Sequence, residues 1–332
     1  MTKLKDQVIL YNSVSYGHLM KTHSTHHPGT WQGKSPLNIA RSHPATAVYQ
    51  NKIYVFGGGG PAFKSLNTVE VYDPISNRWS AGKEMLILRS GAMAMTVGDR
   101  IYVVGGGFKK PDGRFRFLTT VEIYNPLTDT WEKGPDMLQP HDYPAAALLD
   151  GYIYIIGGHH PGATEGGPQT DPGFSFCERF NPVESNWEEI APLTTPRFAA
   201  SAVVHEGRIF TLGGVAFTPQ GFREYDLVEI YDLGRGLWSK STDLVLPWSA
   251  AAHGACIMNN RLYLFGGFSG PGGIGTQAAV YDFHLRTWEI VPFLPQPRAA
   301  MGVAVVGDTI YLVGGWAADR SVMNSVVAYK PL

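Results

Sequence analysis

The stretch IYVFGG, residues 53–58, places four apolar or aromatic residues before two consecutive glycines, which is typical of a short buried strand that ends in a turn. The pattern occurs five more times, as IYVVGG (101–106), IYIIGG (153–158), IFTLGG (209–214), LYLFGG (262–267) and IYLVGG (310–315). Successive copies are roughly 50 residues apart, and a period of this length indicates a repeat architecture. The sequence therefore predicts six copies of one structural unit.

Fixed distances connect each copy to its flanking residues. A second apolar element that ends in Tyr or Phe follows every copy, and in five units a tryptophan comes seven residues later: Trp79, Trp131, Trp187, Trp238 and Trp288. Sixteen residues before the first glycine, four units have an arginine: Arg41, Arg89, Arg197 and Arg298. Paired strands require constant spacings, because a slip of one residue turns every side chain to the opposite face.

Each unit contains four short strands, a to d, which are too few to bury both faces of their sheet. Units that pack face to face around an axis solve this problem and form a β-propeller. The sixth unit stops at Leu332 before any tryptophan, whereas Trp31 stands ten residues before Arg41, as Trp79 does before Arg89. We expect an all-β, six-bladed propeller over residues 28–332, in which an N-terminal strand d with Trp31 joins C-terminal strands a–c, and a tail or outer strand over 1–27.

The paired glycines, the Tyr and the Trp at fixed offsets resemble the kelch repeat, over about residues 28 to 332. The resemblance implies a kelch propeller, and kelch propellers divide between protein-interaction modules and free-standing propellers with a small-molecule site. We expect a free-standing propeller here.

Composition excludes several classes of protein. The formal net charge is −1 without long runs of like charge, which argues against a nucleic-acid partner or a membrane partner. No stretch has the length of a transmembrane helix or the pattern of a signal peptide. Two cysteines, Cys177 and Cys256, allow at most one disulfide and no thiolate zinc cage. We expect a cytoplasmic protein that requires no cofactor.

Length variation points to one face as the binding face. From the second glycine to the Tyr or Phe, the b–c connection spans 14, 18, 22, 17, 14 and 14 residues in units one to six, whereas the c–d turns hardly vary. The d–a connections lie on the same face as the b–c connections. Because binding residues concentrate on loops carried by a rigid scaffold, the mouth of the channel on this face is the candidate site.

Imidazole, phenol and carboxylate groups follow the Arg position and the paired glycines. As candidates for acid–base catalysis we select His43, His141, Asp142, Tyr143 and His159. His141 stands where other units have arginine, and alternation along a strand would send it and its two neighbours to different sides. Candidate ligand-binding residues are Ser42, Ser90, Phe108, His160, Phe198, Trp248, His253, Phe268 and Trp316.

Two functions remain open from the sequence. The first is a small-molecule site at the channel mouth with His/Tyr acid–base chemistry of an isomerase, lyase or cyclase type. His43, Tyr143 and His253 are candidate ligands for a divalent metal there, although His253 is one position out of phase with the other two. The alternative is a scaffold that binds a peptide or protein partner on the same face.

Overall fold

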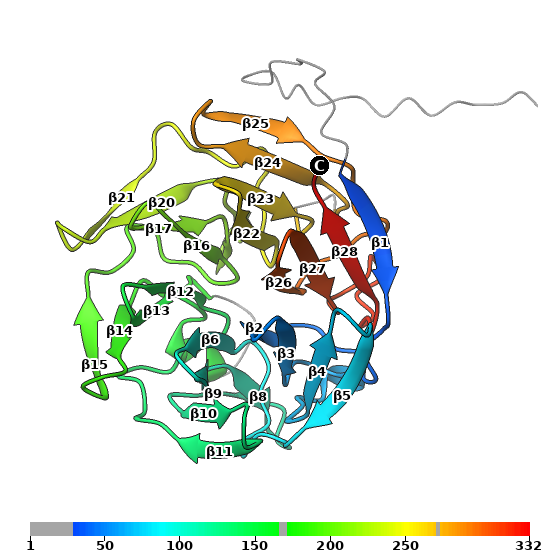
Figure 1. Ribbon diagram of the computed structural model, residues 1–332. Coiled ribbons are helices and arrows are strands. Elements are labelled where there is room, and N and C mark those ends of the chain that lie inside the picture. Colours follow the sequence, from blue (N-terminus) through cyan, green and yellow to red (C-terminus); the bar gives the residue numbers. More distant parts are fainter. Residues whose placement is uncertain (1–28, 166–170, 270–272) are drawn as a thin grey trace, which may run out of the picture.

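Six four-stranded antiparallel sheets surround a central axis in the part of the chain that the structure describes (Figure 1), and residues of their innermost strands line a channel. The structure is a computed structural model, and it describes residues 29–165, 171–269 and 273–332. The predicted six-bladed propeller is therefore confirmed, whereas the expected tail over residues 1–27 lies outside the described residues.

Each blade has its strands a to d ordered from the channel outward. The strands are, in blade one, β2 (Ala45–Tyr49), β3 (Lys52–Phe56), β4 (Val69–Asp73) and β5 (Arg78–Gly82); in blade two, β6 (Met93–Val97), β7 (Arg100–Val104), β10 (Val121–Asn125) and β11 (Thr130–Lys133); in blade three, β12 (Ala145–Leu149), β13 (Tyr152–Ile156), β14 (Cys177–Asn181) and β15 (Asn186–Ile190); in blade four, β16 (Ser201–His205), β17 (Arg208–Leu212), β20 (Val228–Asp232) and β21 (Leu237–Lys240); in blade five, β22 (Gly254–Met258), β23 (Arg261–Phe265), β24 (Ala278–Asp282) and β25 (Thr287–Ile290); and in blade six, β26 (Gly302–Val306), β27 (Thr309–Val313), β28 (Val326–Lys330) and β1 (Thr30–Lys34).

Short elements lie in four of the b–c connections. Blade two carries the hairpin β8 (Gly107–Lys109) and β9 (Phe115–Phe117), and blade four carries the hairpin β18 (Val215–Thr218) and β19 (Gly221–Glu224). The 3-10 helix η2 (Pro161–Glu165) lies in the blade-three connection, and a shorter one, η1 (Pro61–Phe63), lies in blade one. The three longest connections in the sequence thus all contain additional structure, and the short connection of blade one contains only η1.

The core lies between neighbouring blades. The Tyr of strand c pairs in register with the Trp of strand d, as Tyr72 does with Trp79. The Trp79 indole then donates a hydrogen bond to the Ser35 carbonyl, which follows β1 in the neighbouring blade, at 2.7 Å. Aromatic rings bury large apolar areas and align blades at the same time, which explains their fixed spacing in the sequence.

Blade six is closed by strands from both ends of the chain. β1 pairs with β28 in the register Trp31 to Tyr329, and the Trp31 indole donates to the Pro292 carbonyl of blade five at 2.8 Å. These contacts repeat those of Trp288, which pairs with Tyr281 and donates to the Val245 carbonyl at 2.9 Å. The predicted closure by Trp31 is confirmed.

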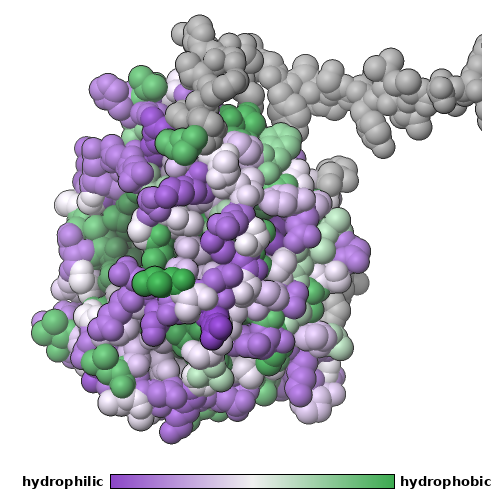
Figure 2. Space-filling model, turned by 45° about the vertical axis from the view of Figure 1, so that its right-hand side comes forward, coloured by the Kyte–Doolittle hydropathy of each residue, from purple (hydrophilic) through white to green (hydrophobic). Residues whose placement is uncertain are grey.

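The outer surface is mixed in character. On the side shown in Figure 2, hydrophobic residues mostly alternate with hydrophilic ones. Within the described ranges, no helix is long and apolar enough to cross a membrane. Cys177 and Cys256 are buried and do not form a disulfide.

Ring closure can be tested by truncation. Deleting residues 1–35 removes β1, leaves the hydrogen-bonding edge of β28 unpaired and exposes apolar surface, so we expect a lower melting temperature and aggregation. Thermal unfolding followed by circular dichroism, with light scattering, measures both effects. Deleting only residues 1–28 retains β1 and is the matched control. A truncated protein without β1 that melts like the full-length protein would contradict the closure.

Candidate functional site

The b–c and d–a connections meet at one end of the channel, which we call the upper face. The residue after the Arg position pairs through backbone hydrogen bonds with the residue after the paired glycines, as in Ser42 with Gly59 and Ala299 with Trp316. Equivalent bridges join Ser90 to Gly107, Phe198 to Val215 and Ala251 to Phe268. The two groups of candidate residues therefore lie side by side around the upper face.

A closed circle of backbone hydrogen bonds joins the blades at the top of the channel. In each blade, the residue two positions after the Arg position donates its N–H to the carbonyl of its counterpart in the neighbouring blade, at 2.6 to 3.1 Å. All members have positive φ: His43, Gly91, Tyr143, Ala199, Ala252 and Ala300. His43 and Tyr143 both belong to this circle, as their equivalent positions in the sequence predict. His253, which is one position out of phase with them, does not belong to it.

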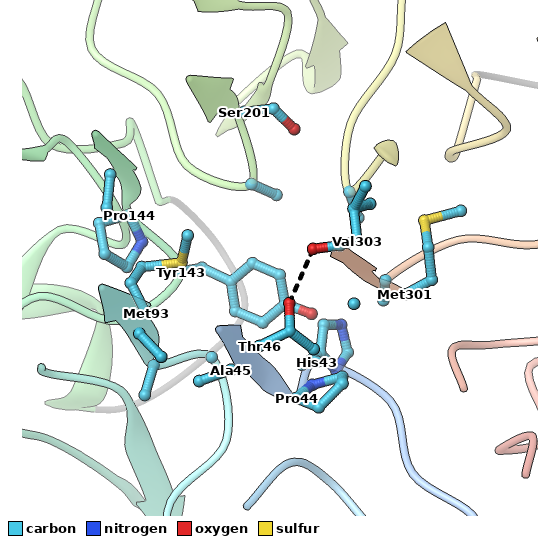
Figure 3. Close-up of a pocket in the computed structure, with 18 of the residues that line it drawn as sticks. His43, Pro44, Ala45, Thr46, Met93, Tyr143, Pro144, Ser201, Met301 and Val303 are labelled. Carbon is cyan, nitrogen blue, oxygen red and sulfur yellow. Dashed lines mark hydrogen bonds between the residues drawn. The ribbon is translucent and has the colours of Figure 1, made fainter. Parts of the chain in front are cut away.

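The His43 ring packs against the rings of both Tyr143 and Trp316. The His43 ring meets the Tyr143 ring edge-to-face with centroids 4.2 Å apart, and the Trp316 ring in the same manner at 4.3 Å. Figure 3 shows the His43 and Tyr143 side chains pointing toward each other from different blades. Burial lowers the pKa of His43 to about 3, with a smaller contribution in the same direction from His159. The His43 imidazole is therefore neutral at pH 7.

A cavity of about 310 Å³ occupies the channel beside these rings. His43, Tyr143 and His253 line it, together with Met93, Met301 and small residues of the innermost strands. His253 is 5% exposed, and burial lowers its pKa to about 4 against the opposing effect of the Ala250 carbonyl. The His253 ring nitrogens and the Tyr143 hydroxyl are themselves buried, and the Tyr143 hydroxyl has no hydrogen-bonding partner among the described residues.

His141 lies inside blade three, away from the channel. It is fully buried, and its ring nitrogens face the Gly157 carbonyl at 2.6 Å and the Glu178 carboxylate at 3.0 Å. Arg41 makes the same two kinds of contact, with the Gly57 carbonyl and Glu70. His141 thus occupies the place of a structural arginine. Its side chain lies apart from that of Tyr143, although the two residues are close in sequence.

Trp248 provides a similar contact in blade five. This blade has Ala250 at the Arg position, and the Trp248 indole donates to the Gly266 carbonyl at 3.4 Å. The carbonyl of Gly266 corresponds to that of Gly57 in blade one. The geometry of Trp248 therefore supports a structural role, and Trp248 does not line the channel cavity.

His159 connects the loops of three blades. Its ring is stacked on Phe198 of blade four, with centroids 3.9 Å apart, and on Phe117 of blade two, at 5.6 Å. Its Nδ1 is hydrogen-bonded to the Asp171 carboxylate, which also accepts backbone N–H bonds from His160 and Gly173. Burial by itself would raise the pKa of Asp171. The hydrogen bond and charge of His159, together with the two backbone N–H bonds, have the larger effect, so the pKa of Asp171 lies below its usual value. Asp171 further pairs through its backbone with Phe217.

Asp142 is a buried carboxyl group between blades two and three. It is 8% exposed, and its Oδ1 has no partner among the described residues. Burial raises its pKa to about 7, Asp171 acts in the same direction, and His159 opposes them. Asp142 is therefore partly protonated at neutral pH.

The remaining candidates lie on the upper face but contact other protein groups. The Ser42 and Ser90 hydroxyls donate to the Gly59 and Gly107 carbonyls, both at 3.4 Å. The exposed His160 accepts a hydrogen bond from the Gly162 N–H. Phe108 lies in β8, and Phe268 lies beneath the Arg320 guanidinium at 5.4 Å. None of these residues lines the channel cavity.

The hairpins β8–β9 and β18–β19 and the blade-three connection between them form one wall, which we call the rim (residues 107–117, 159–165, 171–176 and 215–224). Phe117 and Phe217 connect the hairpins to the blade-three connection through His159 and Asp171. A groove of about 390 Å³ lies between β8–β9 and blade three, lined by Lys110, Phe115, Arg116, Phe117, Pro140 and Pro161. At the rim's surface, Phe115 is 48% exposed and Phe222 is 64% exposed.

Sequence reasoning missed Asp171, Phe117 and the rim groove. KPDGR, residues 110–114, contains the Pro-Asp-Gly signal of a turn between two short strands, which could have revealed β8–β9. Asp171 has no such signal, because its contact with His159 depends on the path of a long connection. In the described part of the chain, no group of three or more His, Cys, Asp or Glu side chains is arranged to hold a metal ion.

The structural role of His141 can be tested by stability. His141→Ala leaves the buried Glu178 and the Gly157 carbonyl without this partner, so we expect a loss of about 3–5 kcal/mol in the free energy of unfolding. His141→Arg restores the contacts that Arg41 makes in blade one and should retain most of the stability. Urea denaturation measures both variants. An alanine variant as stable as the wild type would contradict this role.

The buried Asp142 predicts a characteristic dependence of stability on pH. Its folded-state pKa of about 7 lies above the unfolded value of about 3.9, so its contribution to stability is complete at low pH and decreases as pH rises through 7. Asp142→Asn removes this dependence. We expect the variant's stability relative to wild type to increase by up to about 4 kcal/mol between pH 4 and 7 and then to level off. Asp99→Asn, at an exposed turn, is the control, and a pH-independent difference for Asp142→Asn would contradict the assignment.

Known proteins similar to this chain are kelch proteins. A family model described as the KLHDC2/KLHL20/DRC7 Kelch-repeats domain matches residues 10–214, and the Kelch motif matches 249–292 and 297–332. Beta-scruin of Limulus polyphemus is 29% identical over 77% of this chain and 28% of its own length. Kelch-like protein 23 of Homo sapiens is 29% identical over 78% of this chain and 43% of its own length. The chain thus spans less than half the length of these relatives.

A solved structure supports the same fold. The protein described as "Structure of YjhT" superposes on this chain with a TM-score of 0.74. The superposition covers 89% of this chain and 96% of that protein's chain, and the two sequences are 19% identical. At this identity the likeness extends to the fold alone. Together with the family model, which matches more than half of the residues, the repeats and the blades lead to one conclusion: the chain belongs to the kelch-repeat family.

Proposed function

We propose that this protein is an interaction module that binds an acidic and apolar segment of a partner protein at the rim. The observation that carries the proposal is the groove beside β8–β9, in which two phenylalanines and two prolines form apolar walls next to Lys110 and Arg116. An apolar side chain of the partner would enter this groove, while a neighbouring carboxylate would lie near the cations. The kelch-like relatives support an interaction role in general but specify no partner.

The charges of the rim favour an acidic partner. Lys109, Arg116 and Arg223 are exposed, and no ion pair engages them within the described ranges. The exposed Asp112, in contrast, is paired with Lys110 and Arg114. Charge complementarity of this kind increases the association rate and selects partners, while aromatic and arginine side chains supply much of the binding energy.

We do not extend the proposal to acid–base catalysis. General acid–base chemistry requires two groups that flank a substrate, whereas the His43 and Tyr143 rings are in direct contact. His141, with both ring nitrogens engaged inside the blade, does not face the channel.

Selection from a displayed library of random 12-residue peptides tests the proposal. We expect selected peptides to be enriched in Asp or Glu beside Phe, Leu or Trp, and to bind more weakly as salt increases. Phe115→Ala and Arg116→Glu should each weaken binding of a selected synthetic peptide by about thirtyfold, as for residues at the centre of an interface. Fluorescence anisotropy measures the affinity.

The opposite end of the propeller provides the control. Val183 is 94% exposed in the c–d turn of blade three, so Val183→Ala removes an even more accessible apolar side chain from the other face. We expect this variant to bind like the wild type. Peptides that bind through Val183, or that ignore both rim substitutions, would refute the rim as the binding surface.

A further inference from the structure

Blade five differs from the other blades at its outer edge. Ile290, the second residue after Trp288, is 47% exposed, and Phe293 is 55% exposed in the connection that follows β25. At the position of Ile290 the other blades have small or charged residues: Gly33, Ala81, Lys133, Glu189 and Lys240. At the position of Phe293, blades six, one, two and three have proline or an acidic residue: Pro36, Glu84, Asp136 and Pro192. Large apolar side chains thus occupy both outward positions in blade five.

A third exposed side chain extends this apolar surface toward blade four. Val245 is 45% exposed, and its carbonyl accepts the hydrogen bond of the Trp288 indole, which lies on the same side of β25 as Ile290. We call Val245, Ile290 and Phe293 the blade-five patch. Single exposed apolar residues are ordinary on a protein surface, whereas a group of them around one strand marks a surface that another segment covers.

The patch surrounds a strand with an unpaired edge. β25 is the outermost strand of its sheet (Figure 1), so the backbone groups of its outer edge pair with no strand among the described residues. Proteins protect such edges with charged side chains, as Lys133 in β11 and Glu189 in β15 do at the position of Ile290. Ile290 instead places an apolar side chain beside the edge of β25, which favours the addition of a further strand there.

The N-terminal segment joins the propeller beside this patch. Gly29 precedes β1, and Trp31 in that strand donates to the Pro292 carbonyl, one residue before Phe293. Residues 1–28, which lie outside the described residues, are therefore attached at the boundary between blades five and six. A segment attached so close has a high effective concentration at the patch, which favours it over a separate molecule.

This segment contains one stretch of matching chemistry. Residues 8–11 read VILY, a run of β-branched, aliphatic and aromatic residues that is typical of a short buried strand. Residues 12–28 separate the run from Gly29 and can span up to about 60 Å when extended. The run is thus long enough to lie beside β25 and is connected by enough chain to reach it.

We propose that residues 8–11 form a further strand along the outer edge of β25 and cover the blade-five patch. Backbone hydrogen bonds to the edge attach the strand, and its apolar side chains pack on Val245, Ile290 and Phe293. None of these three residues lines the channel cavity or the rim groove. The proposal therefore does not depend on the partner proposed for the rim.

Disulfide trapping in the full-length chain tests this contact. Positions 8 to 11 are replaced by cysteine one at a time, each together with Ile290→Cys, while the native Cys177 and Cys256 are buried. A disulfide requires the two Cα atoms to lie within about 7 Å of each other. Under oxidation by glutathione disulfide, we expect at least one of the four pairs to link within one chain about tenfold faster than the control, because burial of apolar side chains favours the docked segment by this factor or more. Non-reducing electrophoresis and peptide mass spectrometry measure the linkage.

Gly33→Cys, in place of Ile290→Cys, is the matched control. Gly33 is the equivalent position of blade six, is exposed, and an added Cβ there meets no atom within 4 Å. It is also much closer along the chain to residues 8–11, so a tether without docking would link this pair at least as fast. Phe293→Asp, added to the pair that links fastest, should slow the linkage about fivefold because the patch loses its largest apolar side chain.

Three results would overturn the proposal. The first is that no pair with Ile290→Cys links faster than the control, and the second is that Phe293→Asp leaves the rate unchanged. The third is a disulfide that joins two chains, which would assign the blade-five patch to a second copy of this protein.

Discussion

The circle of backbone hydrogen bonds around the upper channel constrains the rest of the structure. Each bond joins neighbouring blades through one residue with left-handed φ, which turns its N–H and carbonyl along the circumference. Glycine adopts this conformation without a steric penalty only at Gly91, whereas three alanines and the larger His43 and Tyr143 adopt a conformation that is uncommon for residues with a Cβ atom. Such strain is retained where the surrounding structure compensates for it, and it is concentrated at functional sites. The two large residues also pack on each other beside the channel cavity.

Repeat spacing makes the architecture predictable from the sequence, because it reflects contacts that recur in every blade. The distance from Tyr to Trp records the pairing of strands c and d, and the position of Trp31 revealed the closure of blade six. The phase of His43 and Tyr143 was predictable for the same reason. His253 is out of phase because it is the counterpart of Pro44 and Pro144, which follow His43 and Tyr143, and its ring lies near Gly213 of blade four.

The sequence is less informative about the direction of individual side chains. His141, Asp142 and Tyr143 are consecutive, but they enter the blade interior, the boundary between blades and the channel, respectively. Trp248 contacts a glycine carbonyl only because blade five has alanine at the Arg position. Contacts of this kind depend on which residue another blade or loop supplies, and one repeat does not predict the exceptions of the next.

The rim and the channel cavity are connected through a row of aromatic rings. Trp316 packs on His43, His43 on Tyr143, Tyr143 on His159 with centroids 5.9 Å apart, and His159 on Phe198. His159 thus contacts a residue of the cavity on one side, while Phe117 and Asp171 of the rim contact it on the other. Residues in direct contact couple energetically, whereas distant residues without shared partners act independently. A substitution at His159 is therefore expected to affect the packing of both the rim and the channel cavity, whereas Phe222 on the rim and Met301 in the cavity lie outside this row.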